Sequence, residues 1–193
     1  MPRAPSPDDA RTGFTLLEIL VALVLIGLLA GTIVPAVLNQ LSKGEINRVV
    51  EDLAALGTAA KSYRADVQRW PGDLEDLVSR PSGADDTPLG GGSYPTGLVT
   101  RWKGPYLEVG TIPGDTLPTS LGGVILGAMD TTMWGGQAFL TIHVRNISED
   151  DARAISTVVD GDSVIAHGDG AGRVRWREDD GSELMSYLVG PTH

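Results

Sequence analysis

An apolar run near the N-terminus limits how this chain can fold more than any other feature of the sequence. Residues 14–38 read FTLLEILVALVLIGLLAGTIVPAVL and contain a single charged side chain, Glu18. A helix crosses the hydrocarbon core of a membrane with about 20 apolar residues, so this run is long enough to span a bilayer. It is longer than the apolar core of a cleaved secretory signal, which has about 7–15 residues. We therefore predict a transmembrane helix over residues 14–38, preceded by a short polar segment over residues 1–13.

The helix is predicted to continue past the apolar run to about Arg69. Apolar side chains recur there at steps of three and four, which places them on one stripe of a helix. They are Ile46, Val49, Val50, Leu53, Leu56, Ala60, Tyr63 and Val67. The helix should end at Trp70-Pro71-Gly72, because the residue before a proline avoids the helical region. A one-sided stripe has to pack against another part of the chain, and the C-terminal part is the candidate.

The remainder of the chain predicts short elements separated by turns. A short helix is expected over residues 73–78, a loop over residues 80–100 and a helix over residues 150–159 that is opened by Ser148. Strands are expected over residues 138–144, 163–166, 173–177 and 183–189, the second and third of them flanking a turn at 167–172. We therefore predict an α+β fold: a long N-terminal helix, transmembrane in its first half and amphipathic in its second, packed on a small antiparallel β-sheet.

Composition excludes several classes of function. The chain has no cysteine, which excludes a disulfide scaffold, a thiolate metal site and a cysteine nucleophile. Its 25 acidic and 15 basic residues give a net charge of -10, whereas a nucleic-acid partner favours a basic surface. His143, His167 and His193 show no metal-ligand spacing, and there is no Gly-x-Ser-x-Gly elbow. We therefore predict a protein that is not an enzyme, has no resident cofactor and does not bind nucleic acid.

The boundary between the polar segment and the apolar run carries the most specific motif. Residues 13–18, GFTLLE, resemble the prepilin cleavage and methylation signature of type IV pilins and type II secretion pseudopilins. Gly27 and Pro35 stand where that family commonly has a glycine and a helix-softening proline. The resemblance extends to about Arg69 and implies a pilin-like fold.

The resemblance also implies a processing and assembly route. A prepilin peptidase would remove residues 1–13 as a leader by cutting between Gly13 and Phe14, and would methylate the new amine of Phe14. Residues 14–38 would lie in the lipid of the bacterial inner membrane and later in a filament core, while residues 39–193 would form a periplasmic globular domain. An inner-membrane assembly platform would then polymerise the chain with identical or related pilin-like subunits.

Glu18 is expected to need a partner, because inserting an acidic residue at the centre of an apolar membrane helix costs about 2.5–3.5 kcal/mol on insertion scales. The resemblance implies that it pairs with the Phe14 amine of a neighbouring subunit, so that neither charge remains buried and unpaired. The alternative is that Glu18 lies near enough to the membrane edge to be solvated.

A second resemblance is more local. Residues 101–107, RWKGPYL, are similar to the Trp-x-Gly-Pro-Tyr-Leu segment of the major pseudopilin of type II secretion. The similarity decays at Trp134-Gly135, and both the insertion around residues 82–99 and the tail after Arg145 depart from that protein. The calcium site of the family is therefore not carried over, and buried tryptophans packing the sheet remain the simpler interpretation.

Three aspartates are weak calcium candidates on their own chemistry: Asp160, Asp162 and Asp169. Calcium needs several oxygen ligands, but Val164 stands where an EF-hand loop would need one, and turn-forming aspartates explain the segment more simply. Arg173, Arg175 and Arg177 alternate along a predicted strand. They predict a solvated, self-paired face or, alternatively, a subunit contact.

Together these observations predict a structural subunit of a type II secretion pseudopilus or a type IV pilus. The alternative from another class is a membrane-anchored binding or adhesion module, a minor pilin-like protein at a filament tip.

Overall fold

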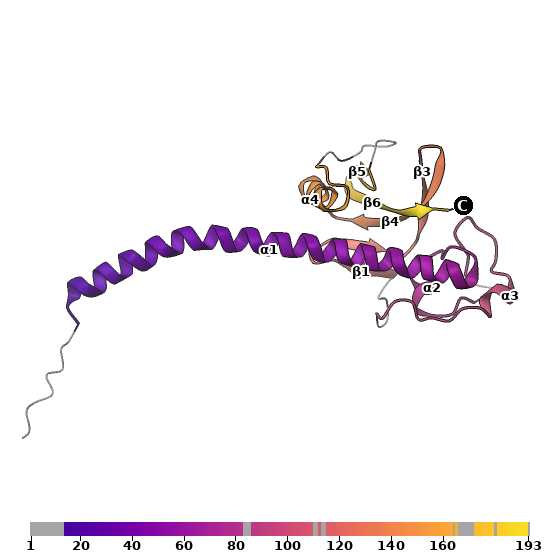
Figure 1. Ribbon diagram of the computed structural model, residues 1–193, viewed down its shortest axis with the longest axis horizontal. Helices are drawn as coiled ribbons and strands as arrows, with labels where there is room; N and C mark the ends of the chain where they lie inside the picture. Colours follow the sequence, from indigo (N-terminus) through magenta and orange to yellow (C-terminus); the bar gives the residue numbers. More distant parts are fainter. Residues whose placement is uncertain are drawn as a thin grey trace, which may run out of the picture. The chain divides into compact units, whose positions relative to one another are not determined.

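The computed structural model describes residues 14–82, 86–109, 112, 115–163, 165, 172–179 and 181–192, and Figure 1 shows the course of the chain. The chain divides into two compact units, Met1–Ser42 and Lys43–His193. The first described element, helix α1 (Leu16–Val67), contributes residues to both units.

Helix α1 begins two residues after Phe14 and ends at Val67, close to the predicted limit of Arg69. Gln68 still donates its N–H to the Arg64 carbonyl at 2.8 Å, but its backbone takes a positive φ of 58°. That left-handed residue ends the helix before the Trp70-Pro71 step is reached.

The second unit contains one antiparallel sheet, whose strand order is β1-β2-β4-β6-β5. The strands are β1 (Thr116–Pro118), β2 (Val124–Leu126), β3 (Asp130–Trp134), β4 (Gln137–Arg145), β5 (Val174–Asp179) and β6 (Ser182–Pro191). Strand β3 lies off this path and pairs with β4. The central pair is β4 and β6, with Ile142 opposite Tyr187. The predicted strands over 138–144 and 183–189 are thus confirmed and each is longer than expected.

In the described part of the unit, three short helices accompany the sheet: α2 (Glu75–Val78), α3 (Thr96–Val99) and α4 (Glu149–Val159). Helix α4 is confirmed together with its cap, because the Ser148 hydroxyl accepts a hydrogen bond from the Asp151 N–H at 3.2 Å. Helix α2 starts slightly later than predicted, and α3 lies inside the segment predicted to be a loop.

The amphipathic half of α1 packs on the sheet, as its periodicity predicted (Figure 1). Every residue of the predicted stripe is buried except Val50, which is partly buried. Their partners include Leu140, Ile142 and Val144, which alternate along one face of β4. Helix and sheet approach each other closely at Gly57: a Cβ there would lie 3.2 Å from Cγ1 of Val189 in β6. The absence of a side chain at Gly57 therefore lets the helix approach the strand.

The predicted hairpin between residues 163–166 and 173–177 is wrong. Ser163 and Ile165, the described residues of the first segment, are not in a strand, and β5 pairs instead with β6. The turn predicted at 167–172 lies outside the described residues except for Gly172. Strand β5 follows α4 and takes the edge position beside β6, so its partner comes later in the chain.

Candidate functional site

The first part of α1 exposes apolar side chains on all sides. The exposed fractions of the large apolar residues from Phe14 to Leu41 run from 47% at Val21 to 84% at Leu16. The helix is long and apolar enough to cross a membrane, and its apolar stretch is not buried within the chain. Ordinary soluble surfaces do not carry a continuous apolar patch of this extent, so this segment needs partners from outside the chain.

The start of α1 is capped by the motif itself. The hydroxyl of Thr15 accepts a hydrogen bond from the Glu18 N–H at 3.2 Å, and its carbonyl accepts from the N–H groups of Glu18 and Ile19. Thr15 and Glu18 thus occupy the two positions of a capping box, Thr-x-x-Glu, in which the acid can also satisfy a free N–H of the first turn. We missed this role for Thr15 in the sequence, although the four-residue spacing would have revealed it.

The other motif residues lie on the same helix. Gly13 lies outside the described residues, whereas Phe14 is 77% exposed directly before the cap. Glu18 is exposed and forms no ion pair within the described part of the chain. A Cβ at Gly27 would meet nothing within 4 Å. Helix α1 continues through Pro35, which has no N–H to offer the Gly31 carbonyl, so the helix is weaker at that turn.

Comparisons with known proteins match both the motif and the globular unit. The family described as "Prokaryotic N-terminal methylation motif" matches residues 9–34. The type II secretion system core protein G of Escherichia coli (strain K12) is 31% identical over 137 residues, which cover 66% of this chain and 93% of that protein. The chain belongs to the type II secretion system core protein G family.

Other members of the core protein G family match over a shorter range. The protein of Klebsiella michiganensis is 38% identical over 77 residues, 38% of this chain and 54% of that protein. The protein of Vibrio cholerae is 36% identical over 87 residues, 44% of this chain and 60% of that protein. In these two matches the chain spans less than two thirds of the relative. No solved structure matches the chain significantly.

The segment that resembles the core protein G family outside the helix, residues 101–107, packs against the core through Trp102, Tyr106 and Leu107, which are partly buried. The indole N–H of Trp102 donates to the carbonyl of Asp76 at 3.0 Å, and the Tyr106 N–H donates to the Leu77 carbonyl at 2.8 Å. A Cβ at Gly104 would lie 2.5 Å from the Trp102 ring, so this position needs glycine. Trp102 is only partly buried, and its ring packs against the core beside Tyr106, so the expectation of a fully buried tryptophan is not met at this position.

Asp66 ties the end of α1 to the same segment. Its carboxylate accepts hydrogen bonds from the Lys103 amine at 2.8 Å and from the Tyr106 hydroxyl at 3.0 Å. The hydrogen bond from Lys103 and the one from Tyr106 lower the pKa of Asp66. The residues of the Trp-x-Gly-Pro-Tyr segment thus hold the last turns of the helix in place.

Asp76 is the most strongly perturbed acid of the second unit. It is 2% exposed, and its Oδ2 accepts from the Tyr94 hydroxyl at 2.6 Å and from the Gly72 N–H at 2.8 Å. Burial raises the pKa of Asp76 to about 6, and the nearby charges of Asp73 and Asp86 add to the effect. Tyr94 lies in the segment predicted to be a loop, and sequence reasoning assigned it no partner.

One prediction for the arginines of β5 is wrong. Arg177 is exposed as expected, but Arg175 is 5% exposed and donates to the carbonyl of Met133 in β3 at 3.4 Å. Strand β3 therefore covers this part of the sheet, which the sequence of β5 alone does not reveal. Arg173 lies over the Tyr187 ring, 4.8 Å from its centroid, and donates to the Tyr187 hydroxyl at 2.6 Å.

A hollow of about 320 Å³ between β3 and β5 contains an acid, an imidazole and a hydroxyl. His143 Nδ1 lies 3.0 Å from the Ser186 hydroxyl, and its Nε2 lies 4.0 Å from the Asp130 carboxylate. Burial lowers the pKa of His143 and so favours its neutral ring. The Asp130 side chain is 71% exposed, so water screens its interaction with the imidazole.

Asp160, one of the three calcium candidates, already has hydrogen-bond partners within the chain. The carboxylate of Asp160 accepts the N–H groups of Arg173 and Val174, each at 3.0 Å, and so fastens the end of α4 to the start of β5. Asp169 lies outside the described residues. Among the described residues, no group of three or more histidine or acidic side chains is arranged to hold a metal ion. Asp160 and Asp162 remain weak calcium candidates, as they were in the sequence.

Proposed function

We propose that this chain is a structural subunit of a type II secretion pseudopilus, assembled through its N-terminal helix. The observation that carries the proposal is the change of α1 from an exposed apolar helix to a helix with one buried stripe. Family membership and the match of the methylation motif to residues 9–34 support it. The relatives are named core proteins of a secretion system, and none of the comparisons favours a binding module at a filament tip.

The processing step is proposed at the bond between Gly13 and Phe14. Residues 1–13 are removed by a prepilin peptidase, which then methylates the amine of Phe14. The cap at Thr15 supports this site, because the cut leaves the helix and its first hydrogen bonds intact. The new amine is a positive charge beside the positive end of the helix dipole, which is unfavourable by about 0.3–1 kcal/mol.

Glu18 is proposed to compensate that charge in the assembled filament. The amine of a neighbouring subunit pairs with Glu18 as the subunit enters, and the pair sets the axial register. Before assembly the chain is held in the lipid of the bacterial inner membrane by residues 14–38, with the globular unit in the periplasm. An assembly platform in the same membrane then moves the subunit into the pseudopilus. The subunit acts mechanically and not as an enzyme.

Processing is tested by replacing Gly13 with leucine in the native host. The bulky side chain should obstruct the peptidase, so the variant should accumulate with its leader attached. Ala10→Leu is the matched control within the leader and should be processed normally. Intact mass should give a mature wild-type protein beginning at methylated Phe14. A mature protein that begins at Met1 in its host contradicts the proposal.

The charge of Glu18 is tested separately from its capping role. Glutamine can occupy the same position of a capping box, but it cannot form an ion pair. Glu18→Gln should therefore insert into the membrane normally and lose incorporation into sheared filaments. Thr15→Ala removes the side-chain cap and keeps the charge, so it should retain incorporation. Wild-type amounts of Glu18→Gln in filaments would refute the pairing.

A further inference from the structure

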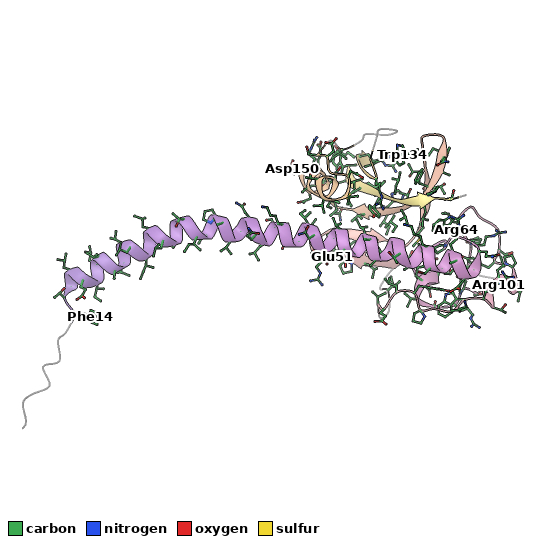
Figure 2. The ribbon with its side chains drawn as sticks, in the orientation of Figure 1. Phe14, Glu51, Arg64, Arg101, Trp134 and Asp150 are labelled. Carbon is green, nitrogen blue, oxygen red and sulfur yellow. The ribbon has the colours of Figure 1, made fainter. Side chains whose placement is uncertain are left out.

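The face of the sheet that is turned away from α1 carries the hollow between β3 and β5, which the structural role does not use. His143 alternates along β4 with the buried residues that pack toward α1, so its side chain lies on the opposite face. Strand β3 forms a hairpin with β4 and lies over this face, where the Met133 carbonyl accepts a hydrogen bond from the Arg175 guanidinium at 3.4 Å. Figure 2 marks the end of β3 with Trp134. The hollow is therefore covered on one side by this hairpin.

Three polar side chains from three neighbouring strands form the floor of the hollow. Ser186 of β6 lies directly opposite Arg175 of β5 on one side and His143 of β4 on the other. The Ser186 hydroxyl lies 3.0 Å from His143 Nδ1, and Arg175 and Ser186 are only 5% and 9% exposed. The floor thus presents a guanidinium, a hydroxyl and an imidazole in one row, about 10 Å wide across the three strands.

The rim of the hollow adds one charge of each sign. Arg177 is exposed and lies two residues beyond Arg175 on the same face of β5, about 7 Å further along the strand. Burial lowers the pKa of His143, and the charge of Arg177 adds to the effect, so Arg177 lies close enough to act on the imidazole. On the β3 side, the exposed Asp130 carboxylate lies 4.0 Å from His143 Nε2. Among the described residues, two guanidinium groups and one carboxylate thus line the hollow.

The sign of these charges points to an anionic ligand. The chain as a whole carries a net charge of -10, so an anion is repelled by the protein at long range. Inside a hollow with protein walls, the attraction of nearby guanidinium groups is screened less than on an open surface. Guanidinium and hydroxyl groups are donors that bind carboxylate and phosphate oxygens, and the hydroxyl groups of Thr131 and Thr132 also belong to the lining residues.

We propose that the hollow between β3 and β5 binds a small organic dianion, with one anionic group on Arg175 and Ser186 and the other on Arg177. The separation of about 7 Å between the two arginine positions suits a ligand with two anionic groups, and carboxylates and phosphates share the required chemistry. The volume of about 320 Å³ lies at the lower end of the range for small-molecule sites, so the ligand has to be compact. The site is complete within one chain, so the proposal does not rest on the proposed function.

The test is isothermal titration calorimetry of the full-length chain in detergent micelles at constant ionic strength. Succinate carries two carboxylates and should bind at one site with a dissociation constant of about 1 mM or lower. Acetate, with one carboxylate, should bind about tenfold more weakly, and 1,4-butanediol, the uncharged molecule with the same carbon chain, should not bind. Inorganic phosphate as a second probe shows which group the site prefers. If neither succinate nor phosphate binds, the proposal is overturned.

Charge variants at the rim should have effects of opposite sign on succinate binding. Arg177→Gln removes a cation and should weaken binding about tenfold. Asp130→Asn removes a repulsive carboxylate and should strengthen binding by up to about fivefold, while the asparagine oxygen can still accept the Thr131 N–H. Arg145→Gln is the matched control: Arg145 is exposed on β4, and its loss changes the net charge by the same amount, so binding should be unaltered. Equal effects of Arg177→Gln and Arg145→Gln overturn the proposal.

The buried guanidinium is tested with Arg175→Lys, which keeps the charge and loses the planar fork that can hold a carboxylate through two N–H groups. This variant should weaken succinate binding about tenfold or more, and a thermal melt without ligand shows whether it is folded. A folded Arg175→Lys variant that binds succinate like the wild type overturns the proposal; if the variant does not fold, the rim variants decide. The rim variants should enter filaments in wild-type amounts, so ligand binding and the structural role are measured separately.

Discussion

Asp76 should make the stability of the globular unit fall as the pH rises, and Asp76→Asn should remove that dependence. The carboxyl is buried, with one oxygen bonded to Tyr94 and Gly72. The other oxygen, Oδ1, is buried without a hydrogen-bond partner in the described part of the chain. An unpaired buried oxygen is tolerated better on a neutral carboxyl than on a carboxylate, which agrees with the raised pKa of Asp76.

The magnitude follows from the pKa of Asp76, which burial raises from 3.8 to about 6. The folded state binds the proton more tightly than the unfolded state, so the stabilising contribution is complete below pH 3.8 and is lost as the pH rises through 6. A shift of about two pKa units corresponds to about 3 kcal/mol. Asparagine does not titrate, and its buried NH₂ group costs about 1–3 kcal/mol at every pH.

The assay is urea unfolding of residues 43–193, followed by tryptophan fluorescence between pH 4 and pH 7. Trp102 reports directly on this site through its bond to the Asp76 carbonyl. At pH 4 the wild type should be the more stable protein, and by pH 7 the free-energy difference should have moved by about 2.4 kcal/mol in favour of Asp76→Asn. Asp66→Asn is the matched control: Lys103 lowers the pKa of Asp66, so the stabilising contribution of that carboxylate is lost only at more acidic pH, and the variant should keep the wild-type slope between pH 4 and pH 7. A free-energy difference between wild type and Asp76→Asn that is the same at pH 4 and pH 7 would refute this reasoning.

Three further predictions concern packing. Leu53→Asp places a charge in the buried stripe and should unfold much of the unit, whereas Glu51→Ala, on the exposed face, should change stability by no more than about 0.5 kcal/mol; thermal melts of residues 43–193 compare the two. Gly104→Ala brings a methyl group against the Trp102 ring and should cost about 1–3 kcal/mol in the same melts. Asp160→Ala leaves two backbone N–H groups without their acceptor and should cost about 1–3 kcal/mol in urea unfolding.

The parts of the fold that follow from local spacing were predictable from the sequence. The stripe from Ile46 to Val67 depends only on helix periodicity, and the burial of Leu53 and Tyr63 follows from it. The cap of α4 depends on Ser148 and on the turn that follows it. Such features are encoded within a few residues of each other, so one sequence is sufficient to reveal them.

The features that sequence reasoning missed depend on packing between distant segments. Arg175 is buried because β3 lies over it, and nothing in the sequence of β5 reports the position of β3. Tyr94 bonds to Asp76 across 18 positions of the chain, so its partner could not be identified within a segment rich in glycine and proline. The candidate site at residues 14–18, in contrast, could be predicted from the sequence. Its residues are contiguous, and their function was inferred from the resemblance to the prepilin motif.

The surface that covers the apolar side chains of helix α1 differs between its first and second halves. Up to Ser42 its apolar side chains are exposed on every face, and the first buried residue is Ile46, directly after the boundary between the two compact units. Before that boundary the apolar surface has to be covered by lipid or by other subunits, and after it the sheet covers one stripe. A substitution before the boundary should therefore change membrane insertion or assembly and leave the stability of residues 43–193 unaltered, whereas a substitution in the stripe should do the reverse.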